Sequence, residues 1–392
     1  MLIEMKGHIK ILIFVLMIFI LNTISTSIAF DQIAAQFLPN GMSIVRGESY
    51  IEGVVFLCIP LSIIFQSLFG SWSDRYGRIK FLLVTNMIML CFCILGYFAE
   101  MLSSSFLMGL SFLCLSVGMS GNSVLLAIIC DISRGKRRLL YFAIVLLTTL
   151  LFFTQRDSYL TGVFLSALGV LLVYPLSKYY TALGYGMIQN RFHNLSFFQH
   201  LVRVFLVRKV WLSIGIYALI NLSYIAYAQL MYGVFVGETP VTFSNFYYYA
   251  FAIFSLGIVC SCFAIFWKRS SHYQLLTFCV GFMALGLIYI LLFRNYIAPE
   301  ILTLPFSFMS GVAAVYAWGL LSFSTNKDSY GLMMGLESLV LQLCYVFISV
   351  LFNGSDRLLS DVYHYDIYGV WVLIAALLLA IYLIFRLKIK AK

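Results

Sequence analysis

A short charged segment stands between two long apolar runs near the start of the chain: Gly70-Ser71-Trp72-Ser73-Asp74-Arg75-Tyr76-Gly77-Arg78-Ile79-Lys80. Charges are unusual here, because only 10% of the 392 residues are charged. Gly70 allows two helices to approach closely, and Gly77 permits a tight turn. The segment therefore predicts a charged turn that joins two closely packed helices.

The composition around this turn indicates a membrane protein. Hydrophobic residues make up 62% of the chain, and charged residues only 10%. A soluble domain carries roughly 25% charged residues, because its surface faces water. The nine cysteines lie inside or at the edges of apolar runs, which argues against a disulfide framework or a metal site. No nucleotide-binding loop, zinc-protease motif or nucleophile elbow occurs. We therefore expect neither an enzyme nor a bound cofactor.

The apolar runs predict an all-α polytopic membrane protein with twelve transmembrane helices. A helix needs about 20 predominantly apolar residues to cross the hydrocarbon core. The predicted spans are 11–34, 51–70, 80–100, 104–130, 139–155, 159–177, 210–233, 244–267, 274–293, 298–323, 330–352 and 367–386. The runs are continuous rather than alternating, which excludes a membrane barrel. The first run is too long for a cleavable signal, so we expect it to be retained.

A long polar stretch divides the predicted spans into two groups of six. We expect a six-helix half over 1–177, a cytoplasmic linker over 178–209 and a second six-helix half over 210–392, as in transporters built from two repeats. With both termini inside, 21 basic residues fall on inner segments and 4 on outer ones. The lipid bilayer thus explains the net charge of +10, and no nucleic-acid partner is expected.

The charged turn has a mechanical interpretation. Asp74 can face the positive N-terminal end of a neighbouring helix, such as the predicted span that begins near Tyr330. Arg75 and Arg78 can pair with acids or with helix C-termini. Such a cluster can act as a latch that stabilises one of two arrangements of the helical halves. The alternative is that these residues are ordinary inner-side charges.

The turn resembles the G-x-x-x-D-R-x-G-R-[RK] signature of the major facilitator superfamily, with Ile79 displacing the last basic residue to Lys80. The run from Gly121 to Asp131 is similar to the fourth helix of drug:proton antiporters of the bicyclomycin-resistance type. This resemblance implies that Asp131 pairs with the latch arginine. The latch residues are then Gly70, Asp74, Arg75, Gly77, Arg78 and Asp131. The chain departs from these antiporters at Ser111 and Cys114, which stand where the family has Arg and Gln, and it lacks the Gly-Pro motif of the fifth helix.

Two acids and one polar stripe are candidates for the transport chemistry. Glu337 lies about 10 Å into its span from the inner boundary and can carry the coupling proton; the alternative is a carboxyl that bonds a neighbouring helix or lies at a wet inner vestibule. Asp31 lies near the outer third of the first span and can bind a proton or a cationic substrate; the alternative is that it marks a helix end at the membrane interface. Asn221, Tyr224 and Tyr227 share one helical face and can line a substrate cavity. Bonding between helices is the alternative for this stripe.

The sequence thus predicts a monomeric, proton-coupled secondary transporter of the inner membrane that exports small amphipathic compounds as an antiporter. Its partners would be the small-molecule substrate and protons, with the proton gradient as the driving force. Two alternatives remain open: uptake of a small metabolite by proton symport, and a non-transporting sensor or scaffold with the same fold.

Overall fold

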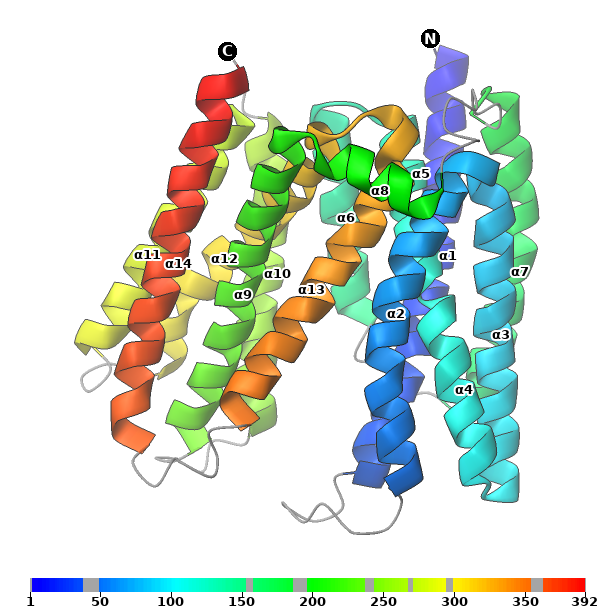
Figure 1. Ribbon diagram of the computed structural model, residues 1–392, viewed down its shortest axis with the longest axis horizontal. Coiled ribbons are helices and arrows are strands. Elements are labelled where there is room, and N and C mark those ends of the chain that lie inside the picture. Colours follow the sequence, from blue (N-terminus) through cyan, green and yellow to red (C-terminus); the bar gives the residue numbers. More distant parts are fainter. Residues whose placement is uncertain are drawn as a thin grey trace. The chain divides into compact units, whose positions relative to one another are not determined.

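The computed structural model describes residues 2–37, 49–152, 158–185, 196–236, 243–266, 271–293, 299–353 and 362–391. All regular structure in these ranges is helical (Figure 1). The helices are α1 (Leu2–Phe37), α2 (Ser49–Tyr76), α3 (Arg78–Leu102), α4 (Ser105–Gly118), α5 (Ser120–Ile132), α6 (Lys136–Phe152), α7 (Tyr159–Ala182), α8 (Phe197–Phe205), α9 (Arg208–Val236), α10 (Phe243–Phe266), α11 (His272–Phe293), α12 (Pro299–Ser324), the 3-10 helix η1 (Lys327–Ser329), α13 (Tyr330–Asn353) and α14 (Val362–Ala391).

The predicted all-helical fold is confirmed, and each predicted span corresponds to a described helix or, for 104–130, to two consecutive helices. Within the described residues, eight helical stretches are long and apolar enough to cross a membrane by length and composition. The fourth span combines α4 and α5, because Met119 between them keeps a right-handed helical conformation (φ −57°, ψ −20°). Helices suit these apolar runs because each helix satisfies its own backbone hydrogen bonds in lipid.

The chain forms two compact units. Unit 1 contains Met1–Arg134, Ile144–Val204 and Thr325–Leu339; unit 2 contains Gly135–Ala143, Phe205–Ser324 and Val340–Lys392. The first part of α13 therefore packs with helices from the beginning of the chain, and the first part of α6 packs with helices from its second part. Each unit therefore contains residues from distant parts of the sequence.

Each unit has its own packed interior. In unit 1, α3 packs against α4 and α7 around Phe92, Phe112 and Tyr159, all of which are buried. In unit 2, α12 packs against α9, α10 and α11, and α14 packs against α9 and α11. The contact between α10 and α12 is close, because a Cβ atom on Gly257 or Gly311 would overlap a carbonyl oxygen of the opposite helix.

Candidate functional site

The latch begins with a backbone contact between α2 and α13 in unit 1. A Cβ atom on Gly70 would overlap the carbonyl oxygen of Gly331, and a Cβ atom on Gly331 would overlap that of Gly70. Only glycine at both positions permits this approach. Gly77 then separates α2 from α3 with a φ of 105°, a left-handed conformation that disfavours any side chain.

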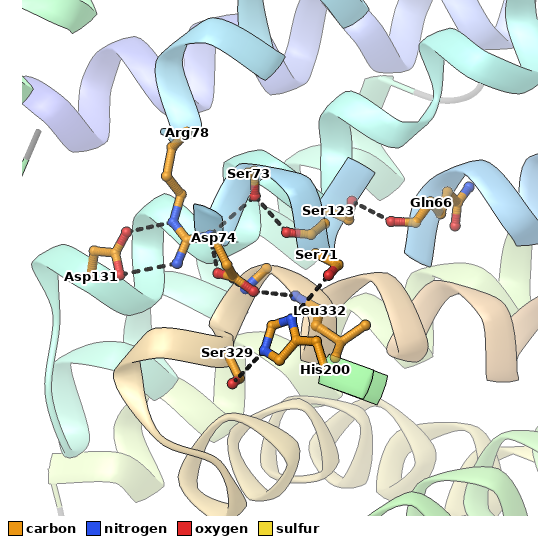
Figure 2. A network of polar contacts seen from close by, with 12 residues as sticks. Gln66, Ser71, Ser73, Asp74, Arg78, Ser123, Asp131, His200, Ser329 and Leu332 are labelled. Atoms are coloured by element: carbon orange, nitrogen blue, oxygen red, sulfur yellow. Dashed lines mark hydrogen bonds and ion pairs between the residues drawn. The ribbon is translucent and has the colours of Figure 1, made fainter. Parts of the chain in front are cut away.

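Asp74 occupies the positive end of α13, as its sequence position suggested. Its two carboxylate oxygens accept hydrogen bonds from the backbone N–H groups of Gly331 and Leu332, each at 2.8 Å (Figure 2). These are donors of the first helical turn that have no partner within the helix. Only 6% of the Asp74 surface is exposed. The carboxylate therefore replaces water as the partner of the helix end.

Arg78 joins Asp74 to the end of α5. Its Nη1 atom lies 2.5 Å from Asp74 Oδ1, and its Nε atom donates to Asp131 Oδ2 at 2.7 Å. The Tyr180 hydroxyl donates to the same Asp131 oxygen at 2.6 Å. Because Arg78 is 3% exposed, its guanidinium depends on these two carboxylates for compensation. The group links α2, α3, α5, α7 and α13 within one unit.

The structure shows which of the two arginines pairs with Asp131. Asp131 pairs with Arg78, whereas Arg75 donates from Nη2 to the backbone oxygen of Ser196 at 2.7 Å. The turn at Gly77 explains the difference, because α3 starts at Arg78 and directs that side chain toward the end of α5. Arg75 belongs to the last turn of α2 and contacts the segment that precedes α8.

Burial controls the protonation of Asp74. Desolvation raises the pKa of its carboxyl to about 6, although Arg78 and the two backbone N–H groups act in the opposite direction. The carboxylate is therefore mostly ionised at neutral pH, the form that accepts all of these hydrogen bonds.

His200 of α8 also belongs to the site, although no sequence motif identifies it. Its Nδ1 atom lies 2.9 Å from the Ser71 hydroxyl of α2, and its Nε2 atom lies 2.9 Å from the Ser329 hydroxyl of η1 (Figure 2). The side chain has no exposed surface. Burial, with the charges of Arg75 and Arg203, lowers the pKa of His200 to about 4, so the ring is neutral at neutral pH. His200 thereby connects α8 to both α2 and η1, the segment that precedes α13.

We expect His200→Ala to lower the melting temperature of the detergent-purified protein at pH 7.5, because two buried serine hydroxyls lose their partner at about 1–3 kcal/mol each. The folded pKa lies below the usual 6.5, so the neutral ring stabilises the protein above pH 6.5. That contribution is lost as the pH falls toward 4. The difference in melting temperature between wild type and His200→Ala should therefore become smaller from pH 7.5 to 4.5.

The exposed Val202 of the same helix provides the control. Val202→Ala should melt close to wild type throughout. A gap for His200→Ala that stays constant across the pH range would contradict the role of the neutral ring. The raised pKa of Asp74 gives the stability a pH dependence of the opposite sign to that of His200. Both proteins contain Asp74, so comparing their melting temperatures at each pH removes its contribution.

The two candidate proton carriers have different positions. Glu337 lies in the part of α13 that belongs to unit 1 and is 3% exposed. Its Oε2 atom accepts a hydrogen bond from the Ser338 hydroxyl at 3.2 Å. Two residues earlier, Gly335 lies against the backbone of Gln66 in α2. Asp31 belongs to α1, but its side chain lies outside the described part of the structure.

The polar stripe of α9 contacts several neighbours. Asn221 Nδ2 donates to the backbone oxygen of Tyr217 at 2.9 Å. The Tyr224 ring lies 4.8 Å from that of Phe254 in α10, and the Tyr227 ring lies 4.0 Å from that of Phe306 in α12. The stripe thus holds α9 against α10 and α12. Among the described residues, no group of three His, Cys, Asp or Glu side chains is placed to hold a metal ion.

No protein-family model and no curated protein matches this sequence. Solved structures do match. The major facilitator superfamily transporter FucP in the outward conformation has a TM-score of 0.70 at 10% identity, over 96% of this chain and 99% of that chain. An outward-facing bacterial homologue of the iron transporter ferroportin gives 0.68 at 16% identity, over 96% and 99%. The proton:xylose symporter XylE gives 0.66 at 14% identity, over 98% and 96%. The chain therefore has the fold of these transporters.

Proposed function

We propose that this chain, which has the major facilitator fold, is a secondary transporter that works by alternating access. The observation that carries the proposal is the buried network of Asp74, Arg78 and Asp131, which binds the α2–α3 turn to the first turn of α13. Networks of this kind stabilise one of two states, and a transporter needs two states of similar free energy. A scaffold protein has no need of two such states.

Proton-coupled efflux of small amphipathic compounds is our first proposal for the transport reaction. It rests on the resemblance of the run from Gly121 to Asp131 to the fourth helix of drug:proton antiporters of the bicyclomycin-resistance type. Uptake by proton symport is the second candidate, and the observation in its favour is the likeness of the fold to XylE, a proton:xylose symporter. We also propose a monomer in the inner membrane with both termini in the cytoplasm; the distribution of basic residues along the sequence supports the position of the termini.

The direct test is transport by the purified protein in proteoliposomes. A thermal-stability screen in detergent first identifies compounds that bind the folded state, because such compounds raise its apparent stability. Each hit is then assayed with an imposed pH gradient of either sign. A hit driven against the proton flux supports efflux, and a hit driven with it supports uptake. Stabilising compounds that never cross the bilayer would contradict transport and favour a sensor.

A further inference from the structure

The end of α7 contributes a hydroxyl group to the latch. The Tyr180 hydroxyl donates to Asp131 Oδ2 at 2.6 Å, and Arg78 Nε donates to the same oxygen at 2.7 Å. Tyr180 is 2% exposed, so this hydrogen bond is shielded from water. α7 corresponds to the sixth predicted span, whereas the latch residues identified in the sequence lie between the second span and the fourth. The latch therefore has a member on a helix outside the signature.

The Asp131 carboxylate determines the direction of the Arg78 guanidinium. Arg78 Nε lies 2.7 Å from Asp131 Oδ2 and Nη2 lies 3.4 Å from Oδ1, so one edge of the guanidinium faces both carboxylate oxygens (Figure 2). The remaining nitrogen, Nη1, lies 2.5 Å from Asp74 Oδ1 and 3.1 Å from the Ser73 hydroxyl. Because the guanidinium is planar and rigid, a rotation of the Asp131 carboxylate would also turn Nη1 away from Asp74.

The C-terminus of α7 fixes the position of the Tyr180 ring. Gly184 follows the helix with a φ of 78°, and its N–H donates to the Thr181 carbonyl oxygen at 2.9 Å. The Tyr185 N–H donates to the Tyr180 carbonyl oxygen at 3.2 Å. This pair of bonds is a Schellman motif, which folds the residue after the glycine back onto the last turn. The Tyr185 ring accordingly lies 5.4 Å from the Tyr180 ring, and its hydroxyl lies 2.9 Å from His8 Nε2 of α1.

We propose that Tyr180 is a positioning residue of the latch, which holds the Asp131 carboxylate in the orientation that directs Arg78 to Asp74. This role presupposes the two-state latch of the proposed function. The Asp131 side chain is 14% exposed, so water can replace a lost donor and allow the carboxylate to rotate. Without the Tyr180 hydroxyl, the state that the latch stabilises should lose population about fivefold, the equivalent of one hydrogen bond.

The test compares Tyr180→Phe with wild type by labelling single cysteines of the full-length protein from each face of the membrane. Phenylalanine keeps the ring and its packing and removes only the hydroxyl, so the protein should still insert. We expect the ratio of labelling from the two faces to change about fivefold, in the same direction as in Asp74→Asn. Tyr179→Phe is the matched control, because the neighbouring Tyr179 ring packs on Phe14 and lies near Lys10 Nζ. It should label like wild type.

A double variant separates positioning through Asp131 from support of the helix alone. If Tyr180 acts through Asp131, Tyr180→Phe combined with Asp131→Asn should label like Asp131→Asn by itself. A hydroxyl that only supports α7 would lower the melting temperature and leave the labelling ratio unchanged.

Two results would overturn the role of Tyr180 while the latch stands, provided that Asp74→Asn still changes the labelling. One is wild-type labelling in Tyr180→Phe, and the other is a sum of separate effects in the double variant. Wild-type labelling in Asp74→Asn as well would refute the latch itself, and the role of Tyr180 with it.

Discussion

Asp74→Asn is expected to reduce transport strongly and to change which side of the membrane the central residues are accessible from, while the protein still inserts. An amide has one acceptor oxygen, whereas the carboxylate accepts from Gly331, Leu332 and Arg78. Its NH₂ group would oppose at least one of these donors, and Arg78 would keep only Asp131 as a charged partner. We expect a population shift of about 1–3 kcal/mol, the scale of typical coupling energies.

The measurement is labelling of single cysteines from each face of the membrane, in a background without other cysteines. Asp328→Asn is the matched control, because it removes an acid from η1, next to Ser329, that takes no part in the network of Figure 2. Wild-type labelling on both faces in Asp74→Asn would refute the latch. Loss of transport with unchanged labelling would indicate a role for Asp74 other than conformational control.

The second large effect is expected at Glu337. If it carries the coupling proton, Glu337→Gln should abolish the pH dependence of substrate affinity, because glutamine keeps the shape and hydrogen bonding but cannot titrate. Proton and substrate binding are reciprocally linked, so removing the proton site removes the linkage. Burial at 3% exposure and the single carboxyl group within α13 make this side chain the first variant to test.

Substrate affinity is measured from about pH 5.5 to 8.5, the range in which a proton carrier must titrate to be useful. Glu100→Gln, at the exposed end of α3, is the control and should keep the wild-type profile. Asp31→Asn tests the other candidate. If Glu337→Gln and Asp31→Asn both retain the pH dependence, neither acid is the proton carrier.

The sequence predicted the helices well because their signal is local. Twenty apolar residues in a row predict a membrane helix whatever surrounds them, and each predicted span corresponds to a described helix or, in one case, to the consecutive helices α4 and α5. The contact between Asp74 of α2 and the start of α13 was also predictable, because a carboxylate and the positive N-terminus of a helix attract each other.

The partners of Arg75 and His200 were not predictable, because they depend on three-dimensional packing. Which arginine reaches Asp131 is decided by the direction of α3 after Gly77, and two arginines three positions apart look equivalent in sequence. His200 binds residues 129 positions away on either side, and its partners are serines, which are common in the chain.

The sequence separations within the latch determine the order in which it can be assembled during synthesis. Arg78 and Asp131 are 53 residues apart, so both are available once the early helices have left the ribosome. Gly331 lies 257 residues after Asp74, near the end of translation. During that interval the Asp74 carboxylate has Arg78 beside it, but no helix N-terminus yet donates hydrogen bonds to it. The nascent first half thus carries an acceptor whose backbone donors are synthesised later, so the network around Asp74 is complete only after α13 has docked.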